Sequence, residues 1–371
     1  MSMKTLGAPL AVLAASALAL SGCASNTPAA TSAPASAGAS AAGAALTGSL
    51  SGAGSSAQEQ AMTAWIAGYK TVQPNVTVQY NSVGSGSGRK NFLAGQVGFA
   101  GSDAALKTEE WEQSKALCGP QGAFNVPAYV SPLAMAYNLG AVKGLKLDPD
   151  TAAKIFKGQI TTWNDPAIAA LNAGVTLPAT KITVVHRSDD SGTTENFTDY
   201  LSQAAPTVWT DAKAQKWPIA GQESAQGTSG VIKLVQSTDG AIGYADESAV
   251  GALGTVQVKV GDAYVGPSAE GAAKAVELSK PVGGQAANDM AVKLDRKPTD
   301  ASAYPIVLVT YEIFCNQYKD ANTAALAKSF GTYLVSAEGQ KAAQAAAKNA
   351  PLSSKVSADA TAAIDKITVA S

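Results

Sequence analysis

The sequence predicts an α/β fold with mostly parallel sheets, because strand-like and helix-like segments alternate along the chain. β-Branched runs of strand length occur at residues 76–80, 181–185 and 306–310. Apolar residues recur at helical spacing at 61–69 and again at 326–334. Such alternation is typical of layered domains in which helices cover a sheet.

Length and composition exclude several classes of protein. The chain has 371 residues, 27 Lys and Arg against 28 Asp and Glu, one His and three Cys. This length favours two domains and can bury a sizeable core. A net charge of −1 supplies no basic face for nucleic acid. One His and three scattered Cys are too few for an ordinary zinc site, so we expect no metal and no cofactor.

The N-terminus has the plan of a bacterial secretion signal. Lys4 precedes a largely apolar run from Leu6 to Leu20, which is too short to span a bilayer comfortably. The run ends in Leu-Ser-Gly-Cys23, which resembles a lipobox, where cleavage before Cys23 leaves its sulfur to receive a lipid. Residues 1–22 are therefore predicted to be a lipoprotein signal peptide. An ordinary signal peptide with a chance cysteine is the alternative.

Residues 23–45 are predicted to be a flexible tether. From Ala24 to Ala45 every residue except Asn26 is Ala, Ser, Thr, Pro or Gly, and none is charged. Such a segment buries too little apolar surface to offset the entropy of ordering. Signal, lipid and tether together predict a folded body held to the extracytoplasmic face of the cell membrane.

Two cysteines remain once Cys23 is acylated. Cys118 and Cys315 lie far apart in the sequence. In an oxidising compartment they are a plausible disulfide. Two isolated buried thiols are the alternative.

Four short glycine-containing loops are candidates to bind an anion. They cover residues 52–57, 84–88, 101–103 and 187–193. Each lies between a predicted strand and a helix, and a helix N-terminus presents free N–H groups and the positive end of its dipole. Glycine lets the backbone approach a ligand, and Ser and Thr add hydroxyl donors. Such loops also simply make turns, so one alone is weak evidence.

The fourth loop carries the strongest signal. Arg187 is a fixed cation whose planar donor fork suits a tetrahedral oxyanion. Asp189, two residues on, could hold Arg187 in position, whereas a surface salt bridge is the alternative for this arginine. Arg89 and Lys90 follow the second loop, and we expect them to be solvated helix residues; the alternative is that they raise the local positive potential.

Further segments at 157–166, 196–201 and 240–244 accompany the four loops. In this order and spacing the chain resembles the phosphate-binding proteins of the Pst ABC transporter. The resemblance covers nearly all of the chain beyond Leu46. It implies a two-lobed periplasmic-binding-protein fold of type II, each lobe a mostly parallel sheet flanked by helices, with the ligand in the cleft between them. It also implies a monomer that captures inorganic phosphate without catalysis and delivers it to the membrane permease subunits of an ABC importer.

The resemblance places a set of phosphate contacts on this chain. These contacts are Ser56, Ala57, Ser85, Asp103, Arg187, Ser191, Gly192 and Thr193, with Asp189 as the acid that orients the arginine. Ala57 stands where many members have Phe, so only its backbone N–H is expected to contribute.

Asp103 needs a separate explanation, because a carboxylate beside an anion is repulsive. The repulsion is tolerable if the ligand brings a proton for the carboxylate to accept. Phosphate carries at least one O–H at neutral pH and sulfate carries none, so Asp103 is predicted to favour phosphate over sulfate. The alternative is that Asp103 caps a helix that starts near Leu106.

The loops fall into two groups along the chain, which predicts the division into lobes. Residues 46–126 and 306–371 are expected to form one lobe, and residues 127–305 the other. The boundaries follow partly from the family and partly from Pro127 and Pro305. Closure of the lobes on a ligand would complete the site from both sides.

Enzymatic interpretations fit the sequence less well. The motif Gly52-x-Gly54-x-x-Ala57 fits a dinucleotide-binding loop, but no acid stands at the end of the following strand, at Asn81. A serine hydrolase would use Ser191 and His186, but Ser191 is not in a Gly-x-Ser-x-Gly elbow. A phosphatase would need a metal cluster or an activated nucleophile, and the sequence shows neither.

Other tetrahedral oxyanions remain open within the binding class. Sulfate, molybdate and arsenate share the geometry of phosphate. Arsenate also shares its protonation, so a carboxylate cannot exclude it by charge alone.

Overall fold

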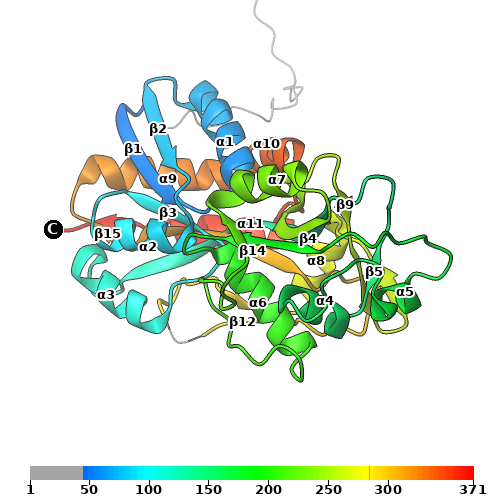
Figure 1. Cartoon of the computed structure of the whole chain (residues 1–371). Coiled ribbons are helices and arrows are strands. Elements are labelled where there is room, and N and C mark those ends of the chain that lie inside the picture. Colours follow the sequence, from blue (N-terminus) through cyan, green and yellow to red (C-terminus); the bar gives the residue numbers. More distant parts are fainter. Residues whose placement is uncertain (1–44, 284) are drawn as a thin grey trace, which may run out of the picture. The chain divides into compact units, whose positions relative to one another are not determined.

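The computed structural model describes residues 45–283 and 285–371 (Figure 1). The predicted signal peptide, Cys23 and all of the predicted tether except Ala45 lie outside these residues. Within the described part of the chain, no helix combines the length and the apolar character needed to cross a membrane.

A nine-stranded sheet forms the centre of the fold. Its order is β2 (Val76–Asn81), β1 (Gly48–Gly54), β3 (Phe99–Ser102), β14 (Val307–Cys315), β4 (Ala123–Tyr137), β8 (Ala241–Asp246), β6 (Thr183–Arg187) and β7 (Glu223–Ala225), with β9 (Gly254–Thr255) paired to β4. Pairs are parallel at both outer ends and antiparallel through β14 and β4. The three predicted strands are confirmed as β2, β6 and β14, whereas the antiparallel centre was not foreseen.

Helices and three small sheets surround this sheet. The helices are α1 (Glu59–Val72), α2 (Ser85–Leu93), α3 (Thr108–Cys118), α4 (Pro149–Phe156), α5 (Pro166–Leu171), α6 (Gly192–Ala204), α7 (Gly227–Ser237), α8 (Ala269–Glu277), α9 (Ala321–Val335), α10 (Ala337–Ala347) and α11 (Ser354–Ile364), with a 3₁₀ turn η1 at Glu247–Ala249. The small sheets join β5 (Lys146–Leu147) to β10 (Gln257–Val260) and β11 (Ala263–Val265), β12 (Lys280–Pro281) to β13 (Val292–Lys293), and β15 (Gln317–Tyr318) to β16 (Thr368–Val369). The two predicted helices are confirmed as α1 and α9.

The long strands β4 and β14 connect two groups of elements. Both strands are buried along their whole length and pair with each other antiparallel. β14 also pairs with β3, whereas the second half of β4 pairs with β8. Strands β1, β2 and β3 accordingly lie on one side of the pair and β5, α4 and α5 on the other (Figure 1).

The C-terminal segment packs against the group of elements that contains β1, β2, β3 and α1. Phe330 of α9 lies 5.5 Å from Phe99 of β3 and 5.1 Å from Tyr69 of α1, ring centre to ring centre. The segment before β13 also reaches this group, because the Met290 N–H donates to the Asn125 carbonyl. Residues far apart in the sequence therefore share one hydrophobic core.

The predicted disulfide is confirmed. Cys118 ends α3 and Cys315 ends β14, and their sulfur atoms are bonded across 197 positions of sequence.

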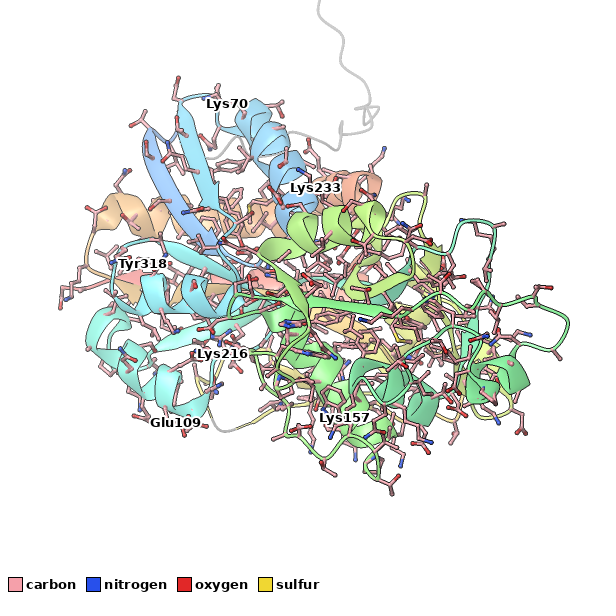
Figure 2. All side chains as sticks on the ribbon, viewed as in Figure 1. Lys70, Glu109, Lys157, Lys216, Lys233 and Tyr318 are labelled. Carbon is pink, nitrogen blue, oxygen red and sulfur yellow. A yellow bond between two sulfur atoms is a disulfide. The ribbon has the colours of Figure 1, made fainter. Side chains whose placement is uncertain are left out.

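Charged side chains lie mainly on the surface of the protein, as Lys70 on α1 and Lys233 on α7 illustrate (Figure 2).

Candidate functional site

The four predicted loops meet at one place in the structure. Ser56 lies between β1 and α1, Ser85 is the first residue of α2, and Ser191 is the N-cap of α6. Asp103 follows strand β3, is only 3% exposed, and contacts Ser55, Ser85 and Thr193 in the other three loops. Three helix N-termini therefore present backbone N–H groups and positive dipole ends to a common point, an arrangement that favours an anion.

Close backbone contact between the second, third and fourth loops requires a glycine at position 192. A Cβ at Gly192 would lie 2.5 Å from the Ser85 hydroxyl oxygen and 2.9 Å from Cβ of Asp103. The Ser85 oxygen also accepts a hydrogen bond of 3.1 Å from the Asp103 N–H. A side chain at Gly192 would separate these loops and open the site.

Arg187 is buried, and Asp189 holds it in position. Its side chain is 1% exposed. Its Nε and Nη2 donate to the two carboxylate oxygens of Asp189, and Nη1 lies 3.4 Å from the Thr193 hydroxyl. Burial raises the pKa of Asp189, but the hydrogen bonds and charge of Arg187 outweigh it and hold that pKa below its ordinary value. The guanidinium is thus oriented by a fixed anion.

Hydroxyl groups surround the carboxylate of Asp103. Oδ1 accepts from Thr310 at 2.9 Å, and Oδ2 accepts from Ser55 at 2.7 Å. Longer contacts to Oδ2 come from Thr193 at 3.3 Å and Ser85 at 3.5 Å. Burial raises the pKa of Asp103, and these donors together with the Arg187 charge work against that rise. The helix-cap alternative for Asp103 is wrong, since α3 begins at Thr108 after an N-cap of Lys107.

Ser56 and Ala57 lie at the edge of this cluster. The Ser56 hydroxyl oxygen accepts from the Thr228 N–H at 3.1 Å and lies 3.2 Å from the Thr228 hydroxyl. The Ala57 N–H donates to the Ser55 hydroxyl oxygen at 3.1 Å. Thr228 stands at the start of α7, and sequence inspection missed this fourth helix N-terminus because Gly227 and Thr228 follow only a three-residue strand.

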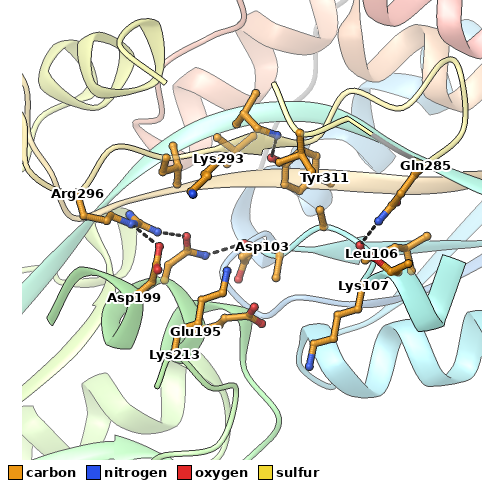
Figure 3. A pocket seen from close by; sticks show the side chains of 18 of the residues that line it. Asp103, Leu106, Lys107, Glu195, Asp199, Lys213, Gln285, Lys293, Arg296 and Tyr311 are labelled. Carbon is orange, nitrogen blue, oxygen red and sulfur yellow. Dashed lines mark hydrogen bonds and ion pairs between the residues drawn. The ribbon is translucent and has the colours of Figure 1, made fainter. Parts of the chain in front are cut away.

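A second set of side chains, linked by hydrogen bonds and an ion pair, holds the backbone of Asp103 in place. Asn196 of α6 donates from Nδ2 to the Asp103 carbonyl at 2.6 Å, and its Oδ1 accepts from Arg296. Arg296 is itself paired to Asp199 at 2.9 Å. These residues line a cavity of about 490 Å³ beside Asp103 (Figure 3). Asn196 lies in a segment that the resemblance had marked, whereas nothing local in the sequence marks Arg296.

One sequence expectation about the charged residues is wrong. Arg89 was expected to be solvated, but its side chain is 1% exposed, pairs with Glu110 at 2.9 Å and donates to the Ser102 hydroxyl at 2.8 Å. The position of Arg89 on the inner face of α2, against β3, buries it. Lys90 is solvated as expected, with 67% of its side chain exposed and an ion pair to Asp190.

The candidate hydrolase pair of Ser191 and His186 has other partners. The Ser191 oxygen accepts from the Thr194 N–H at 3.1 Å, as a helix N-cap does. The His186 ring stacks on Trp217 at 5.5 Å between ring centres, and its Nδ1 lies 2.9 Å from the Arg187 carbonyl. Burial lowers the pKa of His186. This geometry makes Ser191 a helix-capping group and His186 a packed residue at the end of a strand.

The arrangement suits a tetrahedral oxyanion that carries a proton. Neutral donors come from hydroxyls and helix N-termini, and Arg187 supplies a cation already partly balanced by Asp189. Asp103 supplies an acceptor in the middle of these donors. Chemically, the arrangement offers many weak donors to the oxygens of an anion and one carboxylate acceptor to a hydroxyl on it.

Comparisons with known proteins agree with this geometry. Residues 39–338 match the family described as "PBP superfamily domain". The chain is 38% identical over 340 residues to "Phosphate-binding protein PstS 3" of Mycobacterium leprae, covering 89% of this chain and 90% of that one. It is 35% identical over 338 residues to "Phosphate-binding protein PstS 2" of Mycobacterium tuberculosis, with the same coverage of both chains.

The fold matches solved structures as well. A phosphate-binding protein from Stenotrophomonas maltophilia aligns with a TM-score of 0.67 and 22% identity, over 85% of this chain and 94% of that one. The predicted two-lobed α/β fold is thereby confirmed. The chain therefore belongs to the PstS family of phosphate-binding proteins, within the PBP superfamily.

Proposed function

We propose that this chain captures inorganic phosphate at the site around Asp103 and Arg187 and delivers it to the membrane permease subunits of an ABC importer. The observation that carries the proposal is a buried carboxylate, Asp103, set among hydroxyl donors and three helix N-termini. Membership of a family of binding proteins supports binding and transport rather than catalysis.

The contacts proposed for phosphate are those that the sequence placed in the loops. Arg187 and the hydroxyls of Ser85 and Thr193 would donate to phosphate oxygens, as would backbone N–H groups at the start of α6. The Ala57 N–H already donates to the Ser55 hydroxyl. Asp103 would accept the proton of the ligand. Sulfate has no proton to offer at neutral pH, so its oxygens would face the Asp103 carboxylate without a hydrogen bond between them, at a cost on the order of several kcal/mol.

The proposed lobes are residues 46–126 with 306–371, and residues 127–305. Several hydrogen bonds would then cross between lobes: the Gly86 N–H donates to the Asp190 carbonyl at 2.9 Å, and Asn196 donates to Asp103. β4 crosses the proposed boundary at residues 126–127, and the chain returns to the first lobe just before β14. Capture would consist of closing these contacts over the ligand, and release of breaking them.

The location proposed for this chain follows from its N-terminus. Cys23 would carry the lipid that holds the protein to the extracytoplasmic face of the membrane, and residues 23–45 would let the folded body reach the permease as a monomer. Metabolic labelling with a fatty acid should mark the unchanged protein and not Cys23→Ala. Equal labelling of both would contradict the anchor.

Titration calorimetry tests the ligand. The protein is first unfolded and refolded to remove bound ligand, then titrated with phosphate, arsenate, sulfate and molybdate at neutral pH. We expect strong heat with phosphate, similar binding of arsenate, and none with sulfate or molybdate. Absence of heat with phosphate would overturn the proposal, and a preference for sulfate or molybdate would reassign the ligand.

A further inference from the structure

A chain of buried hydrogen bonds connects Gln58 to Asp103, and the donor and the acceptor of each bond can be assigned. Gln58 is fully buried at the start of α1. Its Nε2 lies 3.2 Å from the backbone carbonyl of Tyr311, which can only accept. The Gln58 atom at that position must therefore be the amide nitrogen. This assignment rests on the carbonyl partner and not on a choice of amide orientation.

The orientation of Gln58 sets the direction of the next bond. The other hydrogen on Nε2 points to the Thr310 hydroxyl oxygen at 2.6 Å, so that oxygen accepts. A hydroxyl has a single hydrogen, and the other partner of Thr310 is Oδ1 of Asp103 at 2.9 Å. Thr310 must then donate to Asp103. Thr310 stands where the register of β14 against β4 shifts, a place where strands commonly re-aim a side chain.

The donor to the second carboxylate oxygen of Asp103 can be assigned in the same way. The Ser55 hydroxyl oxygen accepts from the Ala57 N–H at 3.1 Å, so its hydrogen is free to point elsewhere. Its partner is Oδ2 of Asp103 at 2.7 Å. Ser55 and Thr310 are both nearly fully buried, which leaves their hydroxyls no alternative in solvent.

We propose that Ser55, Gln58 and Thr310 are specificity-determining positioning residues, which keep Asp103 an acceptor by directing one hydroxyl hydrogen at each of its carboxylate oxygens. This inference rests on the proposed phosphate function. A protonated Asp103 could donate to a sulfate oxygen, so the discrimination between a ligand with a proton and one without depends on keeping Asp103 ionised. Hydrogen bonds to the ionised form oppose the effect of burial, which favours the neutral form.

Other charged groups also act on Asp103. The Arg187 charge favours its ionised form. Glu312 of β14 and Asp246 of β8 interact electrostatically with Asp103, and burial raises the pKa of both carboxyl groups. All three groups are present in every variant compared below, so only the hydroxyl donors to Asp103 differ between them.

Thr310→Val is the sharpest test, because it keeps the shape of the side chain and removes its donor. Sulfate dissociation constants are measured from pH 8 to pH 5.5 by competition with labelled phosphate. In Thr310→Val we expect sulfate binding to tighten by up to about tenfold per unit fall in pH, because Asp103 takes up a proton on binding. In the unchanged protein and in Thr310→Ser, which keeps the hydroxyl, sulfate binding should stay weak over this range.

Two controls separate this result from a merely structural defect. Thr151→Val removes a buried threonine hydroxyl in α4, away from the site, and should leave the sulfate profile unchanged. Arsenate binding, measured in parallel, should follow phosphate in every variant because arsenate also carries a proton. General loosening of the site would weaken phosphate and arsenate together and give no gain for sulfate in acid.

A flat sulfate profile in folded Thr310→Val would overturn the inference. If that variant does not fold, Ser55→Ala removes the other directed donor and should give the same gain in acid, and a flat profile there would overturn the inference equally. Phosphate binding by the unchanged protein tests the proposed function separately. Strong phosphate binding together with flat profiles in the variants would leave the function standing and remove these residues from its selectivity.

Discussion

Replacing Asp103 by Asn exchanges one carboxylate oxygen for an amide nitrogen, so that a hydrogen-bond donor stands where the site has an acceptor. The carboxylate offers only acceptors, whereas the amide offers one acceptor and two donors. Asp103 is 3% exposed and its oxygens accept from Thr310 at 2.9 Å and Ser55 at 2.7 Å. The amide nitrogen must replace one of these oxygens, so it would face a hydroxyl on one side and the ligand on the other.

The size of the effect follows from the bond that is lost. A hydrogen bond to a charged group contributes about 1.5–3 kcal/mol, and each 1.4 kcal/mol is a tenfold change in affinity, so phosphate should bind Asp103→Asn roughly 10- to 150-fold more weakly. Sulfate loses the repulsion of a carboxylate and gains an amide donor. The ratio of the sulfate to the phosphate dissociation constant should therefore fall by about 100-fold or more.

Calorimetry on refolded protein, with phosphate and sulfate in separate titrations at pH 7.5, measures this ratio. Asp300→Asn is the matched control, because it removes the same charge from an exposed loop and should change neither constant. Equal selectivity in Asp103→Asn and the unchanged protein would refute the assignment of Asp103 as the group that recognises the ligand proton.

Three further outcomes are expected. Arg187→Gln should weaken phosphate binding by about 100-fold, since a charge-assisted donor fork is lost, and calorimetry giving a change below about threefold would contradict this. Replacing Cys118 and Cys315 by Ser opens a loop of 197 positions, so the free energy of unfolding in urea should fall by up to about 5 kcal/mol while phosphate affinity stays the same; an unchanged urea midpoint would count against it. Burial raises the pKa of Asp246 from 3.8 to about 7, so its contribution to stability is full below pH 3.8 and is lost as the pH rises to about 7. Urea titrations at pH 4, 5.5 and 7 should show this loss relative to Asp246→Asn, and parallel curves for the two proteins would exclude it.

Sequence reasoning placed the main groups of the candidate site in four loops, and the structure brings these loops into contact. Ser85, Asp103, Arg187 and Gly192 lie in short motifs whose chemistry is local, and the structure brings those motifs together. Asp189 was expected beside Arg187 because two positions on a strand-end loop are within reach of a guanidinium. The disulfide could also be predicted from the sequence, because two cysteines left in an oxidising compartment have few alternatives.

Other features depended on contacts that no local pattern records. Arg89 looked like a surface residue because it follows a polar loop, yet its helix face turns it toward Glu110 and Ser102. Thr310 lies in an ordinary β-branched run, and only pairing within the sheet brings it to Asp103, 207 positions away. The antiparallel centre arises because β14, which follows the whole middle of the chain in sequence, lies between β3 and β4 and runs antiparallel to both.

The sequence alone predicted an α/β fold and a candidate oxyanion site made of loops, because strand and helix periodicity and loop chemistry are properties of neighbouring residues, and the resemblance to a family of binding proteins added the two lobes. The donor in the hydrogen bonds of Thr310 and Ser55 to Asp103 could be assigned only from the tertiary structure. Gln58 and Thr310 are 252 positions apart, and the Tyr311 carbonyl that orients Gln58 is set by sheet register. The proposed selectivity depends on a buried carboxylate that is held ionised, and both its burial and the direction of its donors exist only once distant segments have packed.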